Sequence, residues 1–426
     1  MTQKRGAAAE DDPGGDSHVA PGGVSKVFAT YYARLFPAAF HKGVGRIAYH
    51  FSGFPGWEGW LVYSELEPCR APSDYSSRVS LHNLGESGTA SKVARVARAG
   101  SFLAFLLKQA RGIDLLNLYD LRPETYLAAF LYRVLNPTGT SFIKLDMDQR
   151  AVDMLLADEK TPQQRINEWL LPRCRVDFVT VETRQIEVQV RDWFELRGIP
   201  VHRVPIGFTY SGPFDIERTM GQKERLIVSV GRLGTRQKHN ELLVDAICQL
   251  PAEVVTGWQV VFIGPGASQF AAWVAERTAQ HPHAGAVIEV IDAIRDREEL
   301  YDWYRRARVF CLTSRWESFC TVLAEALYFG CYLISTRVGA AADLTADGAD
   351  GRLVEVEDGA ALAQALGEVM TASPETLEAA ALRCHERVKR EFDWERICRE
   401  LLAAAGQPSS ARPWHATACA LHGSSR

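Results

Sequence analysis

Short apolar runs alternate with longer segments of helical periodicity along most of the 426-residue chain. We predict a strand at each run, and the strands fall into two series. The first series comprises 26–30, 59–63, 78–81, 113–119, 141–146, 176–181 and 202–205. The second series begins at residue 226 and continues with 258–264, 287–291, 309–313 and 332–336. Because alternating strands and helices favour parallel sheets, we predict an α/β protein with two doubly wound sheets that bind ligands at the carboxyl ends of their strands.

Length and composition agree with two domains. With 426 residues and 47% apolar content, the chain can bury two hydrophobic cores. We assign 25–207 to an N-terminal domain, 208–391 to a C-terminal domain and 392–405 to a final helix. The ends, 1–24 and 406–426, are predicted to be disordered tails, because the first is rich in small and polar residues and the second has no sustained period.

Charge and cysteine usage exclude several classes of protein. The net charge of −4 and the isoelectric point near 6.3 give no reason to expect nucleic acid as a partner. The nine cysteines are scattered and form no C-x-x-C pair, which is typical of the reducing cytoplasm and indicates neither a zinc site nor a disulfide framework. The first residues lack the apolar region of a signal peptide, and no run of about eighteen apolar residues is present. We therefore expect a cytoplasmic protein, either soluble or peripheral on the inner face of the membrane.

Glu317 and Glu325 are separated by seven residues and bracket the start of a predicted helix, 319–329, that follows the predicted strand 309–313. If the residues between them are mostly helical, the two carboxylates are attached at most ~12 Å apart, so that one ligand could contact both. The free N–H groups at the helix start, near Ser318, would face a diphosphate. The alternative interpretation is a solvated helix face.

A second candidate site lies upstream, where an apolar run ends in Gly231 and is followed by Arg232 and Lys238. Glycine lets a ligand approach the backbone closely, and the two cations can bind phosphate groups. Neither G-x-G-x-x-G nor G-x-x-x-x-G-K-[ST] is present here, so an ordinary turn with solvated basic residues is the alternative.

These motifs occur in a recognisable order. Between 226 and 356 the chain carries Gly-Arg-Leu with Gln-Lys, then Phe262-Ile-Gly-Pro-Gly266, then the double-glutamate helix and finally Thr336-Arg-Val-Gly-Ala-Ala-Ala-Asp343. Together they resemble the retaining glycosyltransferases of the GT-B fold, the glycogen-synthase-like and sucrose-synthase-like group known as glycosyl transferases group 1. The resemblance implies two Rossmann-like domains that face each other across a cleft, with the final helix returning to the first domain.

The resemblance also implies roles for individual residues. Arg232 and Lys238 are expected to hold the donor diphosphate, Glu317 to contact the transferred sugar and Glu325 the ribose. The other residues expected in the donor site are Gly231, Ser318, Phe319, Gly339 and Gly264. Cys320 stands where the family usually has glycine, so the backbone beside the phosphates is expected to approach the donor less closely.

The N-terminal domain is expected to bind the acceptor. His41, Lys42, Gly43 and Gly45 follow its first strand, where related enzymes have a flexible glycine loop, and an ordinary connection between strand and helix is the alternative. Asp120 is expected at the edge of the cleft. Lys144 or Asp146 is a candidate for binding acceptor hydroxyls, with capping and ion pairing as the alternative.

Two further features leave alternatives open. Asp146 and Asp148 form an Asp-x-Asp pair, but this pair is far in sequence from the cations that can replace a metal, so we expect no metal and no cofactor. Segment 91–112 is predicted to be a basic, largely apolar helix. It either packs on the sheet with a solvated basic edge or lies on an anionic membrane, where Arg95, Arg98 and Lys108 would contribute the attraction.

The function implied by the resemblance is transfer of a sugar, with retention of configuration, from a UDP- or GDP-sugar. The acceptor is a hydroxyl of a glycan or a lipid-linked saccharide. Two alternatives stay open at this point. One is a nucleotide-sugar 2-epimerase, and the other is a catalytically silent GT-B-like subunit that binds a partner enzyme.

Overall fold

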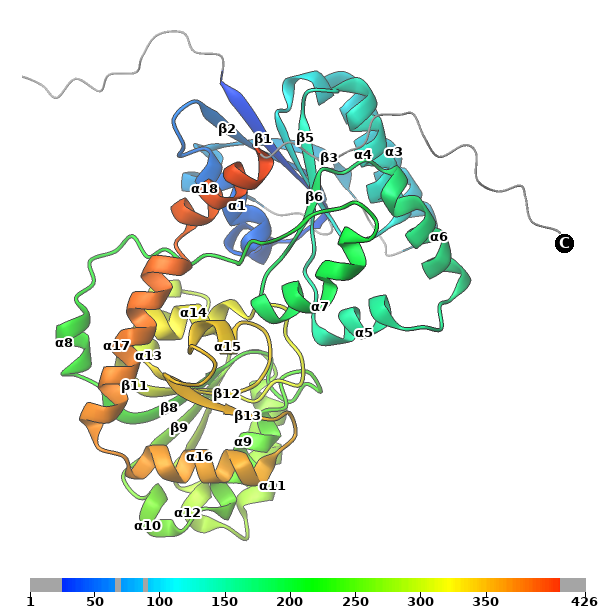
Figure 1. Ribbon diagram of the computed structural model, residues 1–426. Helices are drawn as coiled ribbons and strands as arrows, with labels where there is room; N and C mark the ends of the chain where they lie inside the picture. The colour runs from blue at the N-terminus through cyan, green and yellow to red at the C-terminus, as the bar shows by residue number, and fades with distance from the viewer. Residues whose placement is uncertain (1–24, 66–69, 87–90, 407–426) are drawn as a thin grey trace, which may run out of the picture.

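A computed structural model describes residues 25–65, 70–86 and 91–406. Both predicted tails lie outside the described residues, apart from Gly406 at the end of the last helix. Figure 1 shows two domains, each built around its own twisted sheet with helices on both faces. The predicted α/β class with two doubly wound sheets is therefore confirmed.

The first sheet has the strand order β3-β2-β1-β4-β5-β6-β7, and every neighbouring pair is parallel. Its strands are β1 (Lys26–Leu35), β2 (Trp57–Glu65), β3 (Val79–Glu86), β4 (Leu115–Tyr119), β5 (Thr140–Lys144), β6 (Phe178–Val181) and β7 (Val201–Arg203). The helices of this half are α1 (Gly43–Phe51), α2 (Ser73–Ser76), α3 (Lys92–Gln109), α4 (Pro123–Leu135), α5 (Gln149–Leu156), α6 (Pro162–Leu170) and α7 (Arg184–Glu195). All seven predicted strands of the first series are present.

The second sheet has the order β10-β9-β8-β11-β12-β13 and is also parallel. Its strands are β8 (Glu224–Val230), β9 (Gln259–Ile263), β10 (Ile288–Ile291), β11 (Ala307–Leu312), β12 (Tyr332–Thr336) and β13 (Gly351–Val354). The sequence did not predict β13, which is a short edge strand that pairs only with β12. The helices are α8 (Ile216–Met220), α9 (Asn240–Gln249), α10 (Ala252–Val255), α11 (Ala267–Thr278), α12 (Pro282–Gly285), α13 (Arg297–Arg306), α14 (Thr321–Tyr328), α15 (Ala341–Leu344), α16 (Gly359–Thr371), α17 (Pro374–Glu391) and α18 (Trp394–Ala405).

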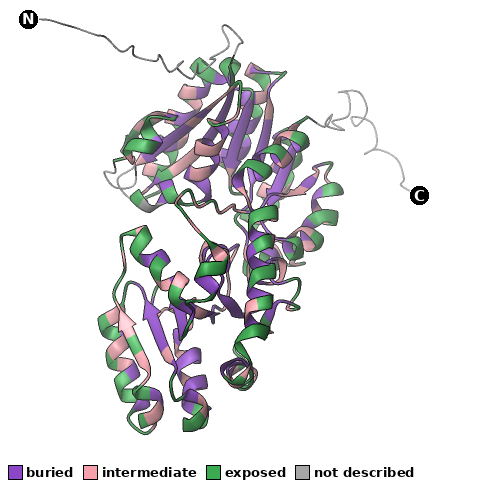
Figure 2. Cartoon of the chain, turned by 90° about the vertical axis from the view of Figure 1, so that its left-hand side faces the viewer, coloured by how far each residue is buried: buried purple, intermediate pink, exposed green. Residues whose placement is uncertain are grey.

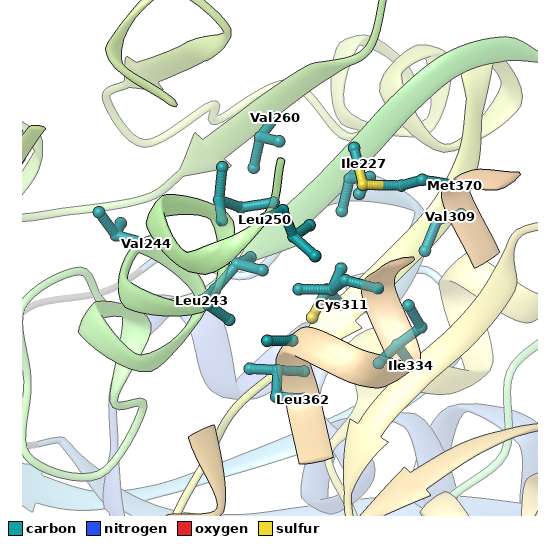
Figure 3. Packing of buried hydrophobic residues seen from close by; sticks show 14 of the residues in the cluster. Ile227, Leu243, Val244, Leu250, Val260, Val309, Cys311, Ile334, Leu362 and Met370 are labelled. Carbon is teal, nitrogen blue, oxygen red and sulfur yellow. The ribbon is translucent and has the colours of Figure 1, made fainter. Parts of the chain in front are cut away.

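Most inner strands are buried because helices cover both faces of the sheets (Figure 2), whereas the edge strand β10 is only partly buried. This burial explains why most strands were readable as apolar runs. In the second domain, α9 and α16 pack on one face of the sheet, where Leu243 and Leu362 meet Ile227, Cys311 and Ile334 (Figure 3). Cys311 is fully buried in this cluster and serves as a small apolar side chain.

The chain crosses between the domains twice, and the two crossing segments pack together. The N–H of Phe208 in the first crossing donates to the carbonyl of Phe392 in the second, at 2.8 Å. A Cβ on Gly207 would lie 2.7 Å from the Trp394 ring, so only glycine fits this approach. Trp394 begins α18, which packs on α1 of the first domain, and its ring stacks on His50 with centroids 5.3 Å apart.

Candidate functional site

The loops at the carboxyl ends of the two sheets meet across the domain boundary. The Arg150 guanidinium, at the start of α5, stacks on the ring of Trp316, 3.8 Å from its centroid. Asp343, in α15, accepts a hydrogen bond of 2.9 Å from the N–H of Arg184 at the start of α7. Arg203 also reaches the Asp343 carboxylate, at 3.5 Å. These contacts bring the double-glutamate region and the first domain together.

The structure places Lys238 and Glu317 in direct contact. The Lys238 ammonium lies 2.6 Å from the Glu317 carboxylate, and both side chains are largely buried. Ser314, just after β11, donates a second hydrogen bond of 2.6 Å to the same oxygen. Burial disfavours the charge on Lys238, but the neighbouring Glu317 carboxylate contributes to a net rise in its pKa, so the lysine stays a cation at neutral pH.

Gln237 connects Arg232 to the ion pair of Lys238 and Glu317. Its amide nitrogen donates to the carbonyl of Trp316 at 3.0 Å and lies 3.5 Å from the Glu317 carboxylate. Its amide oxygen accepts a hydrogen bond from Arg232. Gln237 lies in the Gln-Lys segment but was not predicted to have a role, because Trp316 and Glu317 are 79 and 80 residues away in the chain.

The predicted start of the helix at residue 319 is wrong by two residues. α14 begins at Thr321, and Cys320 precedes it in the left-handed region, with φ of 72°. Glycine is favoured in this conformation, so the cysteine carries backbone strain at the point where the family usually has glycine. The ring of Phe319 is fully buried in the domain core, so the prediction that it contacts the donor fails for its side chain. Ser318 lines a cavity beside Glu317.

Glu325 lies inside the domain, on α14. Its carboxylate pairs with Arg297 at 2.5 Å and lies 3.4 Å from the Tyr304 hydroxyl. Burial raises the pKa of Glu325, and Arg297 opposes that rise. Arg297 was not predicted as a site residue, since nothing local in α13 indicates a partner on α14.

The two glutamates line two different cavities. Glu317 lines a cavity of about 380 Å³ together with Gly339 and residues of α7. Glu325 lines a cavity of about 340 Å³ together with Arg297, and with His41 from the first domain. The segment from Glu317 to Glu325 thus borders two cavities, each large enough for part of a small polar ligand.

The glycines of the predicted donor site allow close packing between loops. A Cβ on Gly264 would lie 1.8 Å from the carbonyl oxygen of Gly231, so the ends of β8 and β9 can meet only without a side chain there. A Cβ on Gly339 would lie 2.9 Å from the Cβ of Glu317. These three glycines therefore fix the positions of the loops that carry Lys238 and Glu317.

The residues of the predicted glycine loop lie in different environments. Lys42 lies near Arg232 and Lys238 of the second domain. Burial is the main cause of the lowered pKa of Lys42, the charges of Arg232 and Lys238 lower this pKa further, and the Asp146 carboxylate raises it. Gly43 lines the cavity beside Glu325. Gly45 was predicted to allow close approach of a ligand, but it is buried, and a Cβ there would lie 2.6 Å from the carbonyl of Ala39. Its role is internal packing.

The two predicted aspartates of the first domain lie at the carboxyl ends of β4 and β5. Asp120 has a φ of 64°, pairs with Arg122 at 3.0 Å and lines a cavity of about 300 Å³ with Asp146. Lys144 does not reach this cavity. It is buried, pairs with Glu182 at 3.1 Å and donates to a backbone carbonyl, which matches the ion-pairing alternative.

Asp148 caps α5 by accepting a hydrogen bond from Ala151 N–H and pairs with Arg150. Asp148 of the Asp-x-Asp pair is therefore a helix cap. Within 25–65, 70–86 and 91–406, no group of three or more His, Cys, Asp or Glu side chains could hold a metal ion. Across the same ranges, no helix is long and apolar enough to cross a membrane.

Comparison with known proteins assigns the second domain. Residues 224–372 match the family model described as Glycosyl transferases group 1. This domain belongs to the glycosyl transferases group 1 family. The group 1 family recognised from the ordered motifs is therefore confirmed, and the matched domain contains Lys238, Glu317 and Glu325.

The matches to two related sequences are longer than this domain. D-inositol 3-phosphate glycosyltransferase of Xylanimonas cellulosilytica is 30% identical over 254 residues, which are 56% of this chain and 58% of that protein. Lipopolysaccharide core biosynthesis mannosyltransferase of Rhizobium meliloti is 24% identical over 320 residues, covering 72% of this chain and 88% of that protein. The match to the first relative thus spans little more than half of its length.

A solved structure extends the likeness to both domains. Sucrose-phosphate synthase from Thermosynechococcus elongatus superimposes with a TM-score of 0.66 at 20% identity, covering 89% of this chain and 100% of that one. With two parallel-sheet domains facing each other, this likeness confirms the predicted GT-B fold.

Proposed function

We propose that the chain is a glycosyltransferase that moves a sugar from a nucleotide diphosphate donor to a hydroxyl of a glycan or a lipid-linked saccharide. The observation that carries the proposal is the cluster of Lys238, Arg232 and Glu317 at the carboxyl end of the sheet of a group 1 domain. Lys42 adds a third cation from the opposite domain. Such a cluster suits a ligand with two phosphates attached to a neutral sugar.

The proposed chemistry uses these cations for the leaving group. Breaking the bond at the anomeric carbon places negative charge on the departing diphosphate, and Lys238, Arg232 and the N-terminus of α14 stabilise it. Glu317 orients the transferred sugar, and the acceptor hydroxyl gives its proton to a phosphate oxygen as it approaches the same face. This route needs neither a protein nucleophile nor a metal, and it retains the configuration of the sugar.

The first domain is assigned to the acceptor. Asp120 and Asp146 border the same cavity of about 300 Å³ at the carboxyl ends of β4 and β5, and their carboxylates can accept hydrogen bonds from sugar hydroxyls. The two relatives are a D-inositol 3-phosphate glycosyltransferase and a mannosyltransferase of lipopolysaccharide core biosynthesis. Both agree with a hydroxylated acceptor.

Helices α3 and α4 are assigned to a surface that contacts the membrane. They expose large apolar side chains, namely Val93, Val96, Leu107, Leu127, Phe130 and Val134. Flotation of the protein with anionic vesicles tests this surface. Val93→Asp and Val96→Asp should reduce flotation, whereas Val188→Asp on α7, which is equally exposed, should leave it unchanged. Flotation that is insensitive to both α3 substitutions would reject the assignment.

Thermal unfolding with a panel of UDP- and GDP-sugars, with and without Mg²⁺, tests the donor site. A ligand at 100 times its Kd should stabilise the protein by roughly 2.7 kcal/mol. Stabilisation without metal that disappears in Lys238→Ala is the expected result.

The same samples distinguish the alternatives. Conversion of the donor to its 2-epimer without any acceptor would assign an epimerase instead. Failure of every nucleotide sugar to bind, together with a partner protein that co-purifies, would favour the silent subunit.

A further inference from the structure

A second cavity in the first domain has a different lining from the one beside Asp146. It measures about 370 Å³ and lies at the carboxyl ends of β1 and β4, between α3 and α4. Three tyrosines and a phenylalanine from these strands and the loop after β1 form part of its wall. Its charged residues are Arg34, Arg95, Arg98, Arg122, Asp120 and Glu124.

Positive charge dominates this arginine cavity. Among the described residues that line it, four are arginines and two are carboxylates, an excess of two positive charges. Asp120 is already paired with Arg122 at 3.0 Å. Arg98 is held against the domain with only 9% of its surface exposed, so part of this charge is fixed in position. Positive groups gathered around a cavity attract an anion more strongly than scattered surface arginines do.

The neighbouring helix end adds to this preference. α4 is a thirteen-residue helix, and its N-cap residue, Arg122, provides no side-chain acceptor for the first N–H groups. Its first turn lines the arginine cavity through Glu124 and Thr125. The N-terminus of a helix favours an anionic oxygen, and guanidinium groups match the oxygens of phosphate in pairs.

We propose that the arginine cavity binds the phosphate group of a phosphorylated acceptor. A phosphate monoester carries about −1.5 to −2 charges at neutral pH, which balances the excess of two, whereas a carboxylate would leave part of it uncompensated. Asp120 lines both this cavity and the one that contains Asp146, so the phosphate lies next to the place assigned to the acceptor sugar. The identification of the ligand as an acceptor rests on the proposed function, whereas phosphate binding in this cavity does not depend on the donor site.

The test is calorimetric titration of the full chain carrying Lys238→Ala, which removes one cation of the donor site as a competing phosphate site. The probes are glucose 6-phosphate, glucose, and farnesyl phosphate in detergent. Arg34→Gln combined with Arg95→Gln changes two exposed side chains of the cavity. Lys108→Gln is the matched control, because it removes a charge from α3 outside the cavity.

The arginine double substitution should raise the Kd of the phosphorylated probe at least tenfold, while Lys108→Gln changes it less than twofold. Glucose should not bind measurably. Preference for farnesyl phosphate would assign the site to a lipid-borne phosphate, and preference for glucose 6-phosphate to a soluble sugar phosphate.

Binding of neither phosphate, or binding that is unaffected by the arginine substitutions in a folded protein, overturns the proposal. Unchanged far-UV circular dichroism and melting temperature establish the fold of each variant. If no nucleotide sugar stabilises the wild-type chain but the arginine-dependent binding is present, the proposed function fails and the phosphate site stands.

Discussion

Lys238 is the residue whose removal tests the proposed donor site most directly. Its ammonium lies 2.6 Å from Glu317, and the two side chains are 13% and 9% exposed. Lys238→Ala removes a fixed positive charge from the place assigned to the leaving diphosphate. The loss of one preorganised group of this kind lowers kcat by about a hundredfold or more. We therefore expect at least that loss in the initial rate of sugar transfer at saturating donor.

The same substitution has a calculable effect on stability. The Glu317 carboxylate loses its cation but keeps the hydrogen bond from Ser314 and the nearby amide of Gln237. Breaking a well-buried pair costs about 3 to 5 kcal/mol, and the remaining donors reduce this to about 1 to 3 kcal/mol in the free energy of unfolding. Urea unfolding at pH 7 measures it.

A double substitution separates the two effects. Lys238→Ala combined with Glu317→Gln removes both charges, so stability should recover toward the wild-type value while activity stays low. The reasoning is refuted if Lys238→Ala, correctly folded, transfers sugar within tenfold of the wild-type rate. It is also refuted if the double variant regains activity along with stability.

Three further predictions concern stability, and urea unfolding measures each of them. Cys320→Val places a β-branched side chain at φ of 72° and should lower the free energy of unfolding by more than about 1 kcal/mol, whereas Cys320→Gly should stay within about 1 kcal/mol of the wild type. Equal losses of stability in the two variants would contradict backbone strain at this position. Burial raises the pKa of Glu182 from its ordinary 4.5 to about 7 despite Lys144, so the stabilisation from its protonated form is full below pH 4.5 and is lost as the pH rises through 7. Glu182→Gln should then remove a decline of about 3 kcal/mol between pH 4.5 and 7.5, and an unchanged slope would argue against the buried carboxyl. Burial lowers the pKa of His50 from 6.5 to about 3, so its stabilisation is full above pH 6.5 and is lost as the pH falls toward 3. His50→Phe, which keeps an aromatic ring on Trp394, should therefore lose about 3 kcal/mol less stability than the wild type on acidification to pH 4.5, and greater acid sensitivity would oppose this.

The sequence was sufficient to predict most of the fold, because strands buried on both faces must be continuously apolar. This rule located most of the twelve predicted strands, although the edge strands β3 and β10 are only partly buried. It did not locate β13, an edge strand of four residues that includes Gly351 and Arg352. The order of the motifs also identified the family, whose matched range, 224–372, contains Gly231, Arg232, Lys238 and both glutamates.

Tertiary structure decided how these residues are partnered. The ion pair between Lys238 and Glu317 joins residues 79 apart in the chain, and nothing local to either one indicates the other. The same holds for Arg297 beside Glu325 and for the arginine cavity, whose members come from two strands and two helices. Local sequence sets backbone propensity and burial pattern, whereas the energy of a charge depends on which charges and how much water surround it, and only the folded chain fixes those surroundings.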